Sequence, residues 1–88
     1  MAKFRLEISA TAEKQIRKLG KVEQIRVLRA VQNLAQEPRP PGTRKLRGYE
    51  DVYRIRIGTH RILYSIESAR LLIIVLKVGH RRDVYRER

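Results

Sequence analysis

The sequence predicts an α+β fold in which a two-helix hairpin packs on an antiparallel sheet, in the order strand, helix, helix, strand, strand, strand. Two observations predict it. Apolar and charged residues alternate at the start of the chain and again after residue 52, as in half-buried strands, whereas apolar residues recur at helical spacing between residues 10 and 36. The 88 residues are expected to form one compact domain, residues 1–88, and 42% hydrophobic content suffices for its core.

The first strand is expected over residues 3–8, where Phe4 and Leu6 alternate with charged neighbours. Ser9 follows, and its hydroxyl can cap the N-terminus of a helix. Apolar residues then recur at helical spacing from residue 10 onward. Gly20 is expected to end this first helix, because glycine is common just after a helix C-terminus.

A second helix is expected over residues 22–36, because Val27, Val31 and Leu34 fall on one apolar stripe. Pro38 ends it, since a proline disfavours helical backbone in the residue before it. Two helices joined by so few residues form an antiparallel hairpin. The following residues, 37–43, hold three prolines and a glycine, which predicts a connector without regular structure.

Three further strands are expected over residues 52–57, 61–66 and 71–78. The first two alternate between apolar and polar residues, and a turn at Gly58 and Thr59 joins them. The third is almost wholly apolar, which is typical of a central strand that is covered on both faces. With the segment at the start of the chain, these strands complete the expected sheet.

Charge is the most marked feature of the composition. Lysine and arginine total 21 against 9 aspartate and glutamate residues, which gives a formal net charge of +12. A field of this size attracts polyanions over roughly a Debye length. Nucleic acid, an anionic membrane surface and an acidic protein partner all remain open as candidates at this point.

Metal, disulfide and membrane roles find little support in the composition. The chain has no cysteine and only two histidines, which excludes disulfides and thiolate metal sites and makes a zinc site unexpected. No metal and no cofactor are therefore expected. The first residues lack the apolar segment of a signal peptide, and the longest apolar run is too short to span a bilayer. A cytoplasmic protein without membrane attachment is expected.

Arg54 and Arg56 are spaced so that a strand directs both side chains to one face, about 7 Å apart. If the next strand pairs through the turn, Arg61 lies close to them. Like charges at such separations are unfavourable on a sheet, so their convergence indicates an anionic ligand that offsets the repulsion. The alternative interpretation is a solvated basic face without a ligand.

The basic tail, residues 79–88, holds further candidates. Tyr85 lies four residues after Arg81, and an aromatic ring among arginines can stack on a nucleobase. The same ring can instead pack on the edge of the sheet. His80 is either a structural residue or a proton acceptor, and His60 is expected in the turn as a solvated loop residue.

In order and spacing, several segments resemble RelE-type toxins of bacterial and archaeal toxin–antitoxin pairs. The segments are Ile8-Ser9-Ala10, Lys45-Leu46-Arg47-Gly48, Tyr53-Arg54-Ile55-Arg56-Ile57, Tyr64, and Val78-Gly79-His80-Arg81-Arg82-Asp83-Val84-Tyr85-Arg86. The resemblance implies a microbial-ribonuclease-like α+β fold. It also implies metal-independent cleavage of mRNA, usually in the ribosomal A site, by attack of the ribose 2′-OH on the adjacent phosphorus.

The resemblance implies roles for individual residues. Arg54 and Arg56 match two basic strand residues, and Arg61 matches an arginine that supports the phosphate. Arg81 matches an arginine of the tail, and Tyr85 matches the tyrosine that stacks on or orients the base. The expected RNA contacts outside this catalytic set are Lys45, Arg47 and Arg82.

One departure from the family bears on mechanism. The two strand positions are lysines in well-known members, whereas this chain has Arg54 and Arg56. Arginine does not release its proton at accessible pH, so a base mechanism that uses these positions is unavailable. Either His80 or Tyr85 takes the proton of the 2′-OH, or electrostatics and geometry imposed by the ribosome carry most of the rate.

The expected partners are the ribosome with its mRNA and a cognate acidic antitoxin of the RelB type, which would form a hetero-oligomer with this chain. Related ParE-type toxins inhibit DNA gyrase and are not ribonucleases, so a gyrase inhibitor is the alternative. A basic module that binds RNA without cleaving it is a third interpretation.

Overall fold

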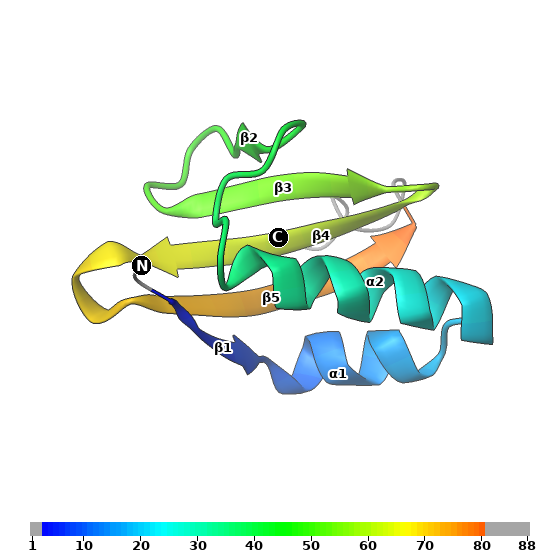
Figure 1. Ribbon diagram of the computed structural model, residues 1–88. Helices are drawn as coiled ribbons and strands as arrows, with labels where there is room; N and C mark the ends of the chain where they lie inside the picture. The colour runs from blue at the N-terminus through cyan, green and yellow to red at the C-terminus, as the bar shows by residue number, and fades with distance from the viewer. Residues whose placement is uncertain (1–2, 81–88) are drawn as a thin grey trace.

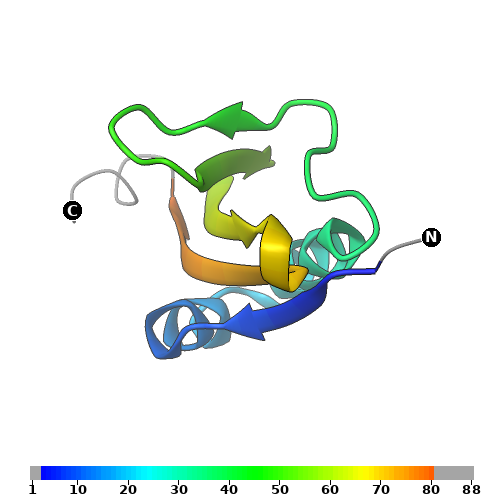
Figure 2. The ribbon, with the colours of Figure 1, turned by 90° about the vertical axis from the view of Figure 1, so that its left-hand side faces the viewer.

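A computed structural model describes residues 3–80 of the chain (Figure 1). These residues form two helices and five strands, and the strands make one sheet. The elements are β1 (Arg5–Ile8), α1 (Ala10–Arg17), α2 (Lys21–Leu34), β2 (Arg44–Lys45), β3 (Val52–Ile57), β4 (His60–Glu67), a short 3₁₀ turn (Ser68–Arg70) and β5 (Leu72–His80). The strand order is β1-β5-β4-β3-β2, and both helices pack on one face of the sheet (Figures 1 and 2). The predicted α+β class and helical hairpin are confirmed.

The sheet differs from the wholly antiparallel arrangement that the sequence predicts. β1 pairs with β5 in parallel, and the other strand pairs are antiparallel, so the sheet is mixed. The short strand β2 also extends the sheet beyond β3. Alternation identifies a strand but carries no information on its neighbour or direction, and β2 has only two residues in which to show a pattern.

Local signals at the ends of the helices are partly confirmed. Ser9 caps α1, since its Oγ accepts a hydrogen bond from the Ala12 N–H at 3.0 Å. Gly20 does not end α1 as predicted, because the C-cap is Lys18. Gly20 has extended backbone (φ −62°, ψ 161°) and is the N-cap of α2, where its carbonyl accepts from the Gln24 N–H. Only Leu19 separates the C-cap of α1 from the N-cap of α2, so Gly20 begins the second helix and does not end the first.

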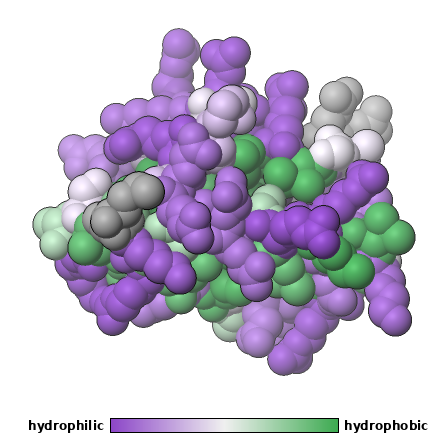
Figure 3. Space-filling model, in the orientation of Figure 1, coloured by the Kyte–Doolittle hydropathy of each residue, from purple (hydrophilic) through white to green (hydrophobic). Residues whose placement is uncertain are grey.

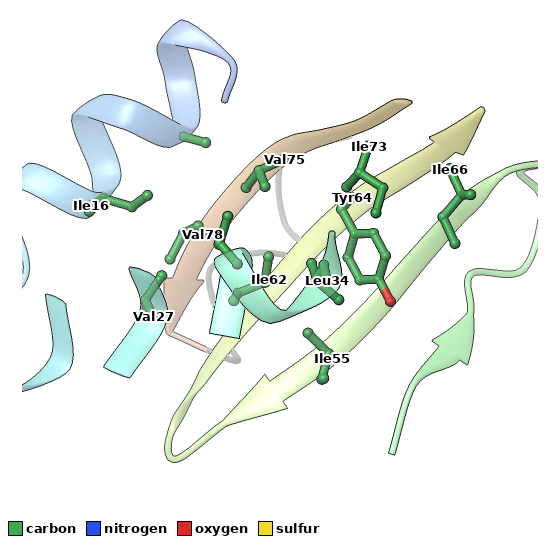
Figure 4. Close-up of a cluster of buried hydrophobic side chains, with 12 residues drawn as sticks. Ile16, Val27, Leu34, Ile55, Ile62, Tyr64, Ile66, Ile73, Val75 and Val78 are labelled. Atoms are coloured by element: carbon green, nitrogen blue, oxygen red, sulfur yellow. The ribbon is translucent and has the colours of Figure 1, made fainter. Parts of the chain in front are cut away.

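The core lies between the sheet and the helices (Figure 4). Ile16 of α1 and Val27 and Leu34 of α2 point toward the sheet, as the helical stripes predict. The sheet contributes residues that share its helix-bearing face: Ile55, Ile62, Tyr64, Ile66, Ile73, Val75 and Val78. Hydrophilic side chains cover most of the molecule when it is viewed from the helix side (Figure 3). The helices therefore cover the apolar face of the sheet, and the side chains of the opposite face are not part of this core.

A β-bulge interrupts the pairing of β4 with β5. Tyr64 lies opposite Val75, and the preceding Leu63 lies opposite Lys77, so Leu76 is an extra residue. Consequently Val75 and Val78 are both fully buried in the core although they are three residues apart. The side chain between the bulge and Val78 is that of Lys77, which points to the opposite face because a bulge resets the alternation.

Side chains of the first helix and its cap hold the bulge. The Ser9 hydroxyl donates to the Leu76 carbonyl at 2.9 Å, and the Gln15 Oε1 accepts from the Val78 N–H at 2.7 Å. The register of β1 against β5 ends at Val75, so these two side chains bond backbone groups that β1 leaves without a strand partner. The helix hairpin therefore helps to determine the register at the end of β5.

Tyr64 anchors the connector between α2 and β2. Its ring is fully buried and stacks on Tyr53, with 6.0 Å between ring centroids. Its hydroxyl donates to the Pro38 carbonyl at 2.7 Å and lies 3.4 Å from Thr43 Oγ1. Arg39 lies over the Tyr53 ring, 5.2 Å from its centroid. The proline-rich segment is therefore held by a buried phenol even though it lacks regular structure.

Stability at alkaline pH is expected to depend on this phenol. Burial raises the pKa of Tyr64 above its ordinary value of 10.0, although the hydrogen bond with Thr43 and the charge of Arg39 oppose part of the effect. The unfolded chain then ionises first, so the stabilisation is complete below pH 10 and is lost as the pH rises toward the pKa of the folded state. We expect the unfolding free energy of the wild type to fall more steeply with alkaline pH than that of Tyr64→Phe.

Urea unfolding followed by circular dichroism from about pH 8 to about pH 11 measures this difference. Tyr49→Phe is the matched control, because the Tyr49 side chain is 44% exposed. The unfolding free energy of Tyr49→Phe should change with pH in the same way as that of the wild type. Parallel curves for the wild type and Tyr64→Phe would show that the Tyr64 phenol does not titrate differently in the two states.

Candidate nucleic-acid interface

The face of the sheet that the helices leave open carries a group of basic side chains. Arg44 of β2 pairs directly with Arg54 of β3, and Arg56 of β3 pairs directly with Arg61 of β4. Partners in a strand pair share a face. The bulge brings a lysine of β5 to the same side. We call this group the basic face, and it comprises Arg44, Arg54, Arg56, Arg61 and Lys77.

The register gives the spacing of the basic face. Directly opposed residues in an antiparallel pair have Cα atoms about 5 Å apart, which applies to Arg56 and Arg61. Lys77 lies opposite Leu63, diagonal to Arg61, at a Cα separation of about 7–8 Å that long side chains can bridge. Arg54 lies on the other side of Leu63. The sheet thus brings cations from four strands to one region.

Burial within the basic face is uneven. Leu63 is 7% exposed and lies between Arg54 and Lys77 in the register. Arg54, Arg61 and Lys77 are half-buried, and Arg56 is exposed. Arg61 Nε is itself buried, so this guanidinium is partly withdrawn from solvent. The basic face thus combines a buried leucine with cations of unequal exposure.

The electrostatics of the basic face favour an anion. Directly opposed like charges destabilise a sheet, and the pair Arg56–Arg61 is such a case. Glu67, a carboxylate farther along β4, is ion-paired with Arg70 at 2.9 Å. Guanidinium groups bind phosphate oxygens through planar pairs of N–H donors. A phosphodiester across the basic face would offset the repulsion between its cations.

The structure brings together three of the residues that the sequence proposes as catalytic, Arg54, Arg56 and Arg61. His80 lies elsewhere: it is in phase with the buried Val78, which places it toward the helix side by alternation. Its ring lies edge-on to that of His60, with 6.2 Å between centroids. His60 is half-buried as the first residue of β4 and is not in the turn as expected.

The remaining predicted site residues lie outside the basic face or outside the described residues. Lys45 pairs with Tyr53 and so lies on the side of the sheet opposite to the basic face. Arg47 is exposed in the loop after β2. The proposed roles of Arg81, Arg82 and Tyr85 concern residues outside the described range. The structure therefore tests the placement of the strand arginines but not that of the tail.

Two members of the basic face, Arg44 and Lys77, are absent from the site that the sequence predicts. Arg44 adjoins Lys45 in a segment without visible alternation, so the side that each faces could not be read. Lys77 is the one charge in the apolar run of residues 71–78. Strict alternation from Ile73 and Val75 would put Lys77 in the core. A charge at an apparent core position was the signal that could have revealed the bulge.

A groove of about 550 Å³ lies apart from the basic face, beside α2. Arg26, Arg29 and Asn33 line it, together with Ile57 at the end of β3. Within residues 3–80, no group of three or more histidine, cysteine, aspartate or glutamate side chains is placed to hold a metal ion. Neither α1 nor α2 has the length and apolar content that crossing a membrane requires. Of these sites, the basic face has the densest charge.

Comparison with known proteins yields one family and a consistent set of relatives. The family model described as the ParE toxin of the type II toxin–antitoxin system parDE matches residues 6–85. Toxin RelG of Mycobacterium tuberculosis is 31% identical over 88 residues, covering 94% of this chain and 97% of the relative. Putative toxin RelE1 of Methanocaldococcus jannaschii is 28% identical over 87 residues, covering 96% of this chain and 97% of the relative.

Solved structures show the same fold. A chain of the archaeal RelE–RelB complex from Pyrococcus horikoshii superposes with a TM-score of 0.81 at 31% identity, covering 94% of this chain and 99% of that one. The isolated Escherichia coli RelE toxin superposes with a TM-score of 0.77 at 28% identity, covering 96% of this chain and 93% of that one. Two helices on a mixed five-stranded sheet are thus shared across nearly the whole length of these proteins.

Proposed function

The chain belongs to the ParE toxin family of type II toxin–antitoxin systems, with relatives named RelE and RelG, and on that premise we propose that it cleaves mRNA in the ribosomal A site. The single observation that carries the proposal is the basic face, on which the register opposes Arg56 to Arg61. Guanidinium groups at this spacing can bind phosphate oxygens through planar pairs of N–H donors. A phosphodiester is the ligand that this arrangement fits.

The proposed reaction is a transesterification without a metal. The ribose 2′-oxygen forms a bond to phosphorus, the bond from phosphorus to the 5′-oxygen breaks, and a 2′,3′-cyclic phosphate remains. Negative charge builds on the non-bridging oxygens in the transition state, and preorganised cations stabilise it there. Arg54, Arg56 and Arg61 are assigned this role, because they converge on one region of the sheet.

The tail completes the proposed site. By resemblance, Arg81 adds a further cation, Tyr85 orients or stacks on the base, and Arg82 contacts RNA. Lys45 and Arg47 are assigned backbone contacts beside the sheet. His80 or Tyr85 is the proposed acceptor of the 2′-OH proton, and the position of His80 in phase with Val78 favours Tyr85 of the two.

An antitoxin is the proposed protein partner. Chains of the RelBE2 toxin–antitoxin complex from Mycobacterium tuberculosis and of the RelE–RelB complex from Pyrococcus horikoshii each superpose on this chain with a TM-score of 0.81. This chain carries a formal net charge of +12. We therefore assign it an acidic antitoxin that associates rapidly through complementary charge and forms a hetero-oligomer with it. Action on translating ribosomes implies that the toxin works in the cytoplasm.

Mapping of RNA ends in cells tests the function. After brief induction of the chain, we expect new 5′ ends within translated mRNAs, in a fixed position relative to the reading frame. Naked RNA should be cut poorly, because the ribosome supplies the substrate geometry. Intact mRNA together with damaged DNA would instead identify a gyrase inhibitor, the activity considered above for ParE-type toxins.

A further inference from the structure

Lys77 is distinctive within the basic face because of its chemistry. Its neighbours Arg54, Arg56 and Arg61 hold a positive charge but do not release a proton at accessible pH. A lysine ammonium can give up a proton and regain it. Among the cations of the basic face, which all lie in the described residues, Lys77 is the one that combines charge with proton transfer.

The fold places Lys77 on this face by a specific device. Without the extra residue Leu76, the burial of Val75 and Val78 on one face would be incompatible with regular pairing. The Ser9 hydroxyl and the Gln15 amide bind the backbone on either side of Lys77, at Leu76 and at Val78. Bulges commonly re-aim a side chain beside an active site. Here the bulge moves a lysine out of the core phase and onto the basic face.

The position of Lys77 relative to Arg61 would allow its ammonium to approach one side of a phosphate bound on the basic face. Lys77 lies diagonal to Arg61 on the neighbouring strand, at a Cα separation that both long side chains can bridge. A phosphate held by Arg56 and Arg61 would thus be within reach of the Lys77 ammonium from the β5 side. The guanidinium groups of Arg56 on β3 and Arg61 on β4 would contact the non-bridging oxygens of the phosphate.

We propose that Lys77 is the general acid of the cleavage reaction, an inference that rests on the proposed function. As the bond from phosphorus to the 5′-oxygen breaks, its electron pair moves to the oxygen, and the Lys77 ammonium transfers a proton to that oxygen. The amine is left neutral and regains a proton from water. An alkoxide is a poor leaving group, so its protonation in the transition state accelerates cleavage.

A pair of substrates separates this role from simple charge stabilisation. One is a ribosome-bound mRNA with the natural 5′-oxygen at the cut site, and the other has sulfur in place of that bridging oxygen. Sulfur departs as a thiolate, which needs no proton because thiols are far stronger acids than alcohols. Full-length wild type and Lys77→Arg are compared on both substrates in single turnover.

We expect Lys77→Arg to cut the oxygen substrate on the order of 10²-fold more slowly than the wild type. The sulfur substrate should be cut by both at nearly the same rate, because arginine retains the charge. Lys77→Met should be at least as slow on the oxygen substrate. Lys14→Arg, an exposed change on α1, is the matched control and should resemble the wild type on both substrates.

Two results would overturn the role of Lys77 while leaving the nuclease proposal intact. One is wild-type cleavage of the oxygen substrate by Lys77→Arg. The other is an equal loss on both substrates, since that identifies a charge or packing effect. If the wild type cuts neither substrate on programmed ribosomes, the proposed function itself fails and this inference with it.

Discussion

Replacing Arg61 with alanine is expected to lower ribosome-dependent mRNA cleavage by about 10²–10³-fold while the chain remains folded. Arg61 lies directly opposite Arg56 and diagonal to Lys77, so it borders cations on both neighbouring strands. Removing it takes away a preorganised donor from the charge that develops on the phosphate. Single-turnover cleavage of mRNA on programmed ribosomes measures the effect.

Two controls make this prediction specific. Arg17→Ala removes an arginine from α1, where its side chain is 73% exposed and ion-paired with Glu13, and should leave cleavage unchanged. Arg61→Lys should recover part of the rate, because a single ammonium replaces the planar pair of donors. Arg81→Ala, at the tail position assigned by resemblance, should also lose most activity. Undiminished cleavage by Arg61→Ala would remove the basic face from the mechanism.

Replacing Tyr64 with alanine is expected to lower the free energy of unfolding by about 3–5 kcal/mol, the cost of removing a large buried aromatic side chain. Tyr64 is fully buried. Its ring lies in the core against Tyr53, and its hydroxyl donates to the Pro38 carbonyl. The alanine variant leaves a cavity and frees the connector between α2 and β2. For a small domain this is a large share of a total stability of about 5–15 kcal/mol.

Equilibrium urea unfolding of Tyr64→Ala and Tyr64→Phe separates packing from hydrogen bonding. Tyr64→Phe keeps the ring and removes only the hydroxyl, so we expect a loss of about 0.5–1.5 kcal/mol. Tyr49→Phe changes a phenol that is 44% exposed and should be close to neutral. If Tyr64→Ala unfolds at the same urea concentration as Tyr64→Phe, the ring does not support the core as described.

Arg61 and Tyr64 lie on opposite faces of the same sheet, and this division has a physical basis. The helices α1 and α2 cover one face, so the apolar residues of β3, β4 and β5 that face them are buried. Within residues 3–80, neither helix lies over the other face, which carries the basic side chains Arg54, Arg56 and Arg61. A substitution on the helix side is therefore expected to act on stability, whereas one on the basic face is expected to act on the reaction.

Much of the fold follows from patterns that are local in the sequence. Alternation over residues 52–57 is enough to place Arg54 and Arg56 on one face and Ile55 on the other, as the structure confirms. The turn at Gly58, with φ 62°, joins β3 to β4 and brings Arg61 beside them, because glycine adopts this backbone without strain. The cap at Ser9 and the apolar stripe of α2 are local signals of the same kind.

Pairing between distant segments decided the rest. The parallel partner of β1, the side of the sheet that Arg44 and Lys45 face, and the position of Lys77 all depend on hydrogen bonds between residues far apart in the chain. The bulge that turns Lys77 away from the core is held by Ser9 and Gln15, more than sixty positions earlier. The sequence by itself determined which residues alternate, since alternation is a property of one strand. Only the tertiary structure determined the register, because register is set jointly by two strands and by the helix that packs against them.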